Sequence, residues 1–119
     1  MSFADPRTRL EHILDAIRDI EGFAAGRTLQ DYLREPWLRL ATQRGIEIIS
    51  EASRHIPDEL KAKHPEIPWR DVAAIGNILR HGYDGLDHAI LWGVVESGLP
   101  PLRAAVESLL REVGTDEMG

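Results

Sequence analysis

Apolar residues recur at steps of three and four positions along most of the chain, and charged residues fill the positions between them. This spacing is typical of amphipathic helices, and no segment alternates apolar and polar residues over the length of a strand. The first helix is predicted to begin after a cap at Asp5, with Pro6 in its first turn, and to end between Gly22 and Gly26. Five aliphatic residues form its core face: Leu10, Ile13, Leu14, Ile17 and Ile20.

Capping residues, prolines and glycines divide the remaining chain into further helices. Thr28 can cap a second helix. Pro36 lies inside this helical pattern and must either kink the helix or restart it, and Pro57 ends the pattern. A polar connector with room for one or two helical turns follows at 57–68. The three last predicted helices lie at 69–81, 86–96 and 102–113, and the segment Gly98-Leu99-Pro100-Pro101 is expected to separate the final two. The core faces predicted for the helices at 69–81 and 86–96 include Val72, Ile75, Ile78, Leu79, Ile90, Leu91, Val94 and Val95.

This pattern predicts one all-α domain over residues 1–119, an antiparallel bundle of four to six helices with a frayed tail at 114–119. The composition is that of a globular protein, with 43% hydrophobic and 29% charged residues. Because the chain has no cysteine, a disulfide framework, a thiolate zinc site and a cysteine nucleophile are all excluded.

Charge and hydropathy narrow the possible partners and location. The formal net charge is −6, which argues against a protein that coats nucleic acid but not against a local basic cleft. The N-terminus has no signal-peptide pattern, and no stretch approaches the roughly 18 apolar residues that a membrane span needs. A cytoplasmic protein without a membrane partner is therefore expected.

The candidate chemistry lies at the end of the helix predicted at 69–81. Asn77 and His81 are one turn apart, within about 40° of each other on the helix surface. Arg80 is one turn from Gly76, and the missing side chain at Gly76 leaves room for Arg80 to lie across it. Tyr83 follows a glycine and can turn toward the same side.

These residue types suit proton transfer beside a phosphate. A histidine can exchange a proton near neutral pH, an arginine can stabilise charge on a phosphoryl oxygen, and an amide can orient either. Cleavage of RNA without a metal requires a base, an acid and a cation. A purely structural role is the alternative: His81 would cap the helix end and Tyr83 would pack against the domain.

The order of several short motifs resembles the HepT-like toxin family of the HEPN superfamily. The motifs are Ile67-Pro68-Trp69-Arg70-Asp71-Val72, Asn77-Ile78-Leu79 with His81 and Tyr83-Asp84, Ile90-Leu91-Trp92, Leu99-Pro100 with Leu102, and the run Arg44–Ala52. The resemblance covers roughly residues 10–110. It implies a helical homodimer that acts on RNA as a metal-independent ribonuclease toxin and needs no cofactor. It also implies a nucleotidyltransferase antitoxin that binds the toxin and attaches AMP to a tyrosine.

The family's catalytic motif is an arginine, four residues, a histidine, one residue and a tyrosine, with a polar residue after the arginine. By this resemblance the histidine is His81, the tyrosine Tyr83 and the polar residue Asn77, whereas the arginine position is occupied by Gly76. One hypothesis is that Arg80 supplies the missing charge from one turn away, giving a weakened enzyme, with Arg70 as part of a basic rim.

Two other hypotheses remain open. The domain can be an inactive dimeric module of the HEPN type that binds a nucleotidyltransferase partner or a nucleotide. A metal site is the least favoured hypothesis, because Asp84, Asp87 and His88 with His81 have suitable ligand atoms but no recognised spacing.

Overall fold

The computed structural model describes residues 5–81 and 87–118, with side chains described up to residue 114. The elements are α1 (Pro6–Ala24), α2 (Leu29–Arg34), α3 (Pro36–Ser53), α4 (Asp58–Lys61), α5 (Trp69–His81), α6 (His88–Gly93), the π-helix η2 (Val94–Gly98) and α7 (Leu99–Met118). The described residues form no strand, and the predicted all-α bundle is confirmed. No helix among them is long and apolar enough to cross a membrane.

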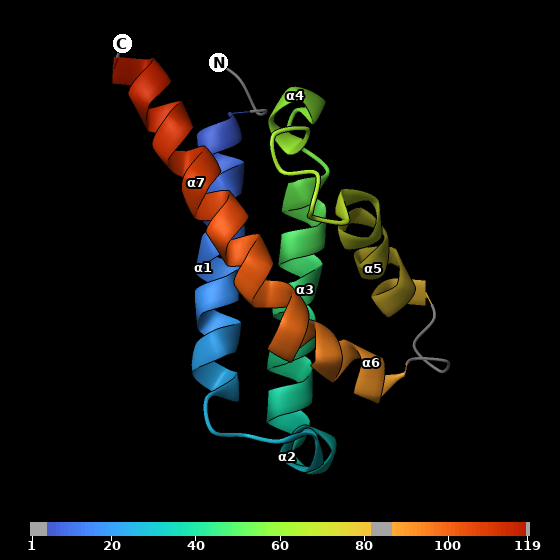
Figure 1. Ribbon diagram of the computed structural model, residues 1–119. Coiled ribbons are helices and arrows are strands. Elements are labelled where there is room, and N and C mark those ends of the chain that lie inside the picture. Colours follow the sequence, from blue (N-terminus) through green and yellow to red (C-terminus); the bar gives the residue numbers. More distant parts are fainter. Residues whose placement is uncertain (1–4, 82–86, 119) are drawn as a thin grey trace.

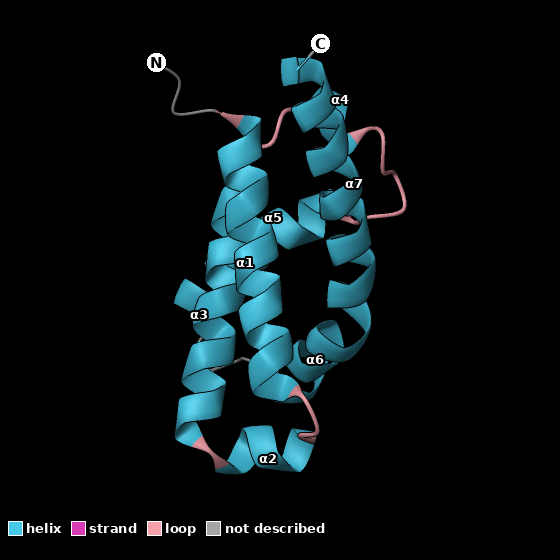
Figure 2. Cartoon of the chain, turned by 90° about the vertical axis from the view of Figure 1, so that its left-hand side faces the viewer, coloured by secondary structure: helices cyan, strands magenta, loops and turns pink. Residues whose placement is uncertain are grey.

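Helix α3 is the centre of the bundle. It lies between α1 and α5, and α7 crosses obliquely over α1 in Figure 1. The short helices α2 and α4 lie near opposite ends of α3, as both views show (Figures 1 and 2). The result is an elongated molecule of 49 × 29 × 27 Å. The side of α5 that does not contact α3 is therefore left open.

Local sequence signals set the first helix boundaries as predicted. The side chain of Asp5 accepts a hydrogen bond from the backbone N–H of Arg7 and caps α1. Thr28 and Asp31 form a reciprocal capping box at α2, in which each side chain accepts from the other residue's N–H. Pro36 restarts the chain as the first residue of α3, because a proline in the first turn lacks only an N–H that has no helical partner.

The prediction of a break at Gly98-Leu99-Pro100-Pro101 was wrong. Helices α6, η2 and α7 follow one another without a gap, so the described chain has six helical segments. The N–H of Leu99 bonds to the carbonyl of Val94, five residues back, and this wider turn lets the helix continue past two prolines that cannot donate. The helix also continues to Met118, through a segment expected to fray.

Buried aliphatic residues of α1, α3 and α7 form most of the core, and the predicted face of α1 is fully buried. Two positions predicted in the core are instead exposed: Ile78 is 53% exposed and Ile90 is 67% exposed. Both follow the helical period, but each lies on a side of its helix that no other described element covers. An apolar residue therefore lies on the open face of α5.

Candidate functional site

Helix α5 packs closely on α3 through Gly76. The buried Ser50 hydroxyl accepts a hydrogen bond from the Gly76 N–H at 3.0 Å and donates one to the Ala73 carbonyl at 2.9 Å. A Cβ atom at position 76 would come within 2.6 Å of the Ser50 Oγ and 2.9 Å of its Cβ. Glycine is thus the residue that permits this separation of the two helices.

The side chain of Arg80 lies over Gly76. Its Nη1 would be 3.6 Å from a Cβ at position 76, and its Nη2 donates to the Asn77 Oδ1 at 3.4 Å. Arg80 is nonetheless exposed, so its guanidinium is held near Asn77 while remaining open to solvent. The side chain of Arg80 thus lies across Gly76, as expected from the sequence.

His81 is the last residue of α5 and is exposed. Because consecutive helical residues point about 100° apart, Arg80 faces α3 whereas His81 faces away from it. Asn77 lies between these two directions, and the exposed Arg70 falls on the same stripe as Asn77 and His81 by helical spacing. The structure thus brings Arg80 and Asn77 into contact and leaves His81 on the open face. Tyr83 lies outside the described residues.

A groove of about 250 Å³ extends from Arg80 along the surface of α3, and it was not predicted from the sequence. It is lined by Arg9 and His12 of α1, by Arg44, Glu47, Ile48, Glu51 and Ala52 of α3, and by Arg80 of α5. The only signal in the sequence is that the α3 residues recur at steps of three and four. No pattern within one helix could indicate that the polar faces of three helices meet.

The surroundings of Glu51, an acid of this groove, lower its pKa. The hydrogen bond between His55 and the Glu51 carboxylate, at 3.1 Å, lowers the pKa of Glu51, and the charges of His55, Arg54 and Arg80 lower it further. Glu51 is therefore ionised at neutral pH and attracts the Arg80 guanidinium toward α3.

Two of the residues considered for a metal site have structural roles. The carboxylate of Asp87 accepts hydrogen bonds from the N–H groups of Ala89 and Ile90 and caps α6. The Nδ1 of His88 is 3.0 Å from the hydroxyl of buried Tyr32. Asp84 lies outside the described residues, and the residues that are described contain no group of three or more potential metal ligands.

Comparison with known proteins identifies the family. The profile of the family described as ribonuclease HepT-like matches residues 13–109. This chain belongs to that family. The match begins within α1 and ends within α7.

Among curated relatives of this HepT-like chain, a Thermococcus cleftensis protein named "Probable ribonuclease HepT" is 41% identical over 100 residues, which cover 84% of this chain and 91% of that protein. A Methanocaldococcus jannaschii protein named "Putative RNase MJ1380" is 34% identical over 107 residues, covering 90% of this chain and 98% of the relative. A protein of Caldanaerobacter subterraneus named "Putative RNase TTE0752" is 33% identical, with coverage of 90% and 96%. No solved structure matches the chain.

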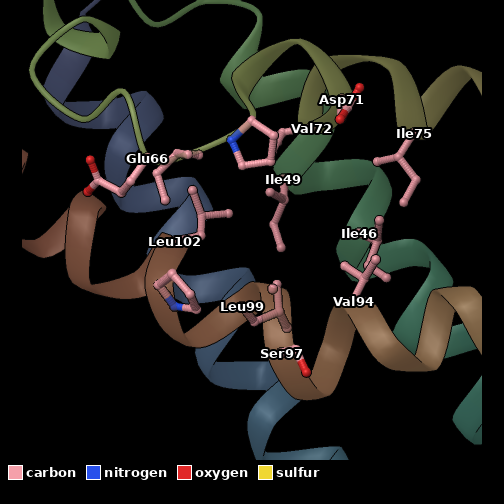
Figure 3. A pocket seen from close by; sticks show the side chains of 14 residues that line it. Ile46, Ile49, Glu66, Asp71, Val72, Ile75, Val94, Ser97, Leu99 and Leu102 are labelled. Atoms are coloured by element: carbon pink, nitrogen blue, oxygen red, sulfur yellow. The ribbon is translucent and has the colours of Figure 1, made fainter.

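The HepT-like domain has a second, apolar pocket of about 280 Å³ between α3, α5 and the start of α7 (Figure 3). Aliphatic side chains form most of its wall, including Ile49, Val72 and Leu102, and the carboxylates of Glu66 and Asp71 lie near its edge. None of the predicted site residues that the structure describes, namely Arg70, Asn77, Arg80 and His81, lines it. Because it offers no cation or imidazole, this pocket is unsuited to cleavage of a phosphodiester.

Proposed function

We propose that this HepT-like protein is the toxin of a toxin–antitoxin pair and a metal-independent endoribonuclease that acts on cytoplasmic RNA. The supporting observation is the position of Arg80. Its guanidinium lies over Gly76 and is held by Asn77, in the region where an arginine at position 76 would begin. A guanidinium charge is therefore available over position 76, although it comes from the next turn of the helix.

In the proposed reaction the 2′-oxygen of a ribose attacks the adjacent phosphorus, and the bond from phosphorus to the 5′-oxygen breaks. The products are a 2′,3′-cyclic phosphate and a free 5′-hydroxyl. His81 transfers the proton, Arg80 stabilises the charge on the phosphoryl oxygens, and Asn77 orients Arg80. A proton leaves the 2′-hydroxyl and one is delivered to the 5′-oxygen, so the atoms balance without a cofactor.

We further propose that the protein is a homodimer that pairs the open faces of two α5 helices. Ile78 is 53% exposed on α5 between the directions of His81 and Asp71, and it is the apolar side chain that such a contact would bury. In such a dimer His81 of the partner subunit could provide the second proton transfer, so that one histidine acts as base and the other as acid.

An inactive module that binds a partner or nucleotide is the second candidate, and the packing at Gly76 favours it. Because Ser50 occupies the space beside position 76, this helix pair cannot hold the motif arginine at its usual position. An arginine that begins one turn away places its guanidinium differently, and a shift of about 1 Å can cost on the order of 10²-fold in rate.

The assay that separates the two candidates is cleavage of RNA in the presence of a chelator. We expect the wild type to cleave and Arg80→Ala to lower kcat/KM by about 100-fold. Arg80→Lys should recover part of this loss, because lysine keeps the positive charge but lacks the planar guanidinium donors of arginine. Unchanged melting temperatures would exclude unfolding as the cause. If the wild type is inactive, or if Arg80→Ala cleaves as well as the wild type, the proposed role of Arg80 is wrong.

The proposed antitoxin can be tested by co-expression with a nucleotidyltransferase, taken from the genes next to the one that encodes this protein if one is present there. We expect the two proteins to purify as a complex and the peptide that contains Tyr83 to gain the mass of AMP. Tyr83→Phe should abolish that mass gain while the complex still forms. An unmodified Tyr83 in a stable complex would show that neutralisation occurs by binding alone.

A further inference from the structure

The groove beside Arg80 has a defined shape and an unusual charge for this protein. Its floor is one face of α3, where Arg44, Glu47 and Glu51 follow at helical steps, and it is bordered by α1 and α5. The distance along α3 from Arg44 to Glu51 is about 10 Å at ~1.5 Å per residue. The groove is thus an elongated surface that begins at the proposed catalytic cation.

Three arginines line this groove: Arg9, Arg44 and Arg80. The chain as a whole has 14 basic and 20 acidic side chains, yet here three arginines and His12 face two glutamates. Among the described residues Arg44 forms no ion pair, although Glu47 lies one turn away on the same helix. Arg44 is also exposed, so its charge remains available to a ligand.

The two glutamates limit the ligands that the groove can bind. The carboxylate of Glu51 is hydrogen-bonded to His55, which lies outside the groove lining, so one of its acceptor oxygens is already engaged there. Glu47 is only partly exposed, whereas Arg44 and His12 are exposed beside it. An extended anion that passes over the exposed cations is therefore favoured over one that must enter the floor of the groove.

We propose that this groove binds the phosphates of single-stranded RNA that flank the cleaved bond, with Arg44 as the main contact and His12 and Arg9 beside it. The proposal rests on the proposed ribonuclease function, because the groove begins at Arg80. It assigns Arg44 a role in binding the substrate rather than in chemistry. Phosphate contacts of this kind supply affinity that does not depend on sequence and that decreases with salt.

The direct test is binding of a 2′-O-methyl oligouridylate of about a dozen nucleotides, which cannot be cleaved because its 2′-oxygens are blocked. Arg44→Gln is expected to weaken binding roughly tenfold and to reduce the slope of log K against log salt by about 0.7, the value for one phosphate contact on a single strand. Glu47→Gln removes a negative charge from the groove and is expected to tighten binding.

Arg18→Gln is the matched control. Arg18 is on α1, nine residues after Arg9, and therefore lies on the opposite side of that helix; it pairs with Glu107 of α7 at 3.9 Å. The substitution changes the charge of the protein by the same amount but should leave the affinity and the salt slope unchanged. If Arg44→Gln and Arg18→Gln have equal effects, only the overall charge matters and the proposal is overturned.

Kinetics then separate this proposal from the function on which it rests. If the protein cleaves RNA, Arg44→Gln should raise KM for the long substrate roughly tenfold and leave kcat unchanged. It should have no effect on a dinucleotide, which is too short to reach Arg44 from Arg80. Normal cleavage by Arg44→Gln with an unchanged KM would reject the proposed role of the groove but not the proposed ribonuclease function. Absence of cleavage together with the predicted loss of binding would reject the ribonuclease and leave the groove as an RNA-binding surface.

Discussion

His81→Ala is expected to lower kcat/KM for RNA cleavage by about 10²- to 10⁴-fold, the range typical for removal of a general acid or base. His81 is exposed at the last position of α5, and the core lies on the opposite side of that helix. The substitution should therefore leave the melting temperature almost unchanged. Initial rates with a fluorescently labelled RNA, measured beside a thermal unfolding curve, test both statements.

His64→Ala provides the comparison, because His64 pairs with Glu66 in the connector before α5 and does not belong to the site. It should cleave at the wild-type rate. A wild-type pH profile that rises and then falls near neutral pH, and that loses one limb in His81→Ala, would identify His81 as a proton-transfer residue. Equal rates for His81→Ala and the wild type would exclude the proposed mechanism.

The sequence predicted the helix that contains the site well, for identifiable physical reasons. The predicted bounds of 69–81 coincide with α5, and Pro68 stands directly before its first residue. The contact of Arg80 with position 76 could also be predicted, since it depends only on the spacing of one helical turn and on the absence of a side chain. Features that lie within one helix are accessible from its period.

Features that depend on how helices meet were not accessible. The groove combines residues from three helices, and nothing in the sequence of α1 relates His12 to Arg44 or Arg80. Ile78 was assigned to the core although it is exposed. The helical period identifies an apolar stripe, but it does not indicate how much of that stripe other helices cover. The π-helix was missed because prolines normally end a helix, and the wider turn that accommodates them has no sequence signature.

The second large effect is expected at Gly76. Gly76→Ala should destabilise the protein by about 1–3 kcal/mol, the usual cost of overpacking, reduced by up to ~1 kcal/mol because alanine favours helix more than glycine does. The new Cβ would meet both the Oγ and the Cβ of Ser50, and only the first of these can rotate away. Gly76→Arg should cost more, since a charged side chain would begin at a buried position. Urea unfolding measures the free energies directly.

The chain contains its own control for this prediction. Gly93 is a helical glycine of α6 with no atom near its missing side chain, so Gly93→Ala should stabilise the protein by up to about 1 kcal/mol. In a double-mutant cycle, Ser50→Gly should remove most of the penalty of Gly76→Ala, because it deletes both clashing atoms. A penalty that persists without the Ser50 side chain would show that the close approach of α3 and α5 is not the cause.

This stability effect bears on the origin of the incomplete motif. If Gly76→Arg separates α5 from α3, it also displaces the Arg80 guanidinium that now lies over Gly76. Restoring the motif arginine in this chain should therefore fail to raise RNA cleavage, even though the motif would then be complete. Gly76 and Arg80 would then together replace the family's arginine at position 76. In this arrangement the close packing of α5 on α3 and the placement of the catalytic cation depend on each other. A more active and equally stable Gly76→Arg variant would instead show that the wild-type site has lost its cation.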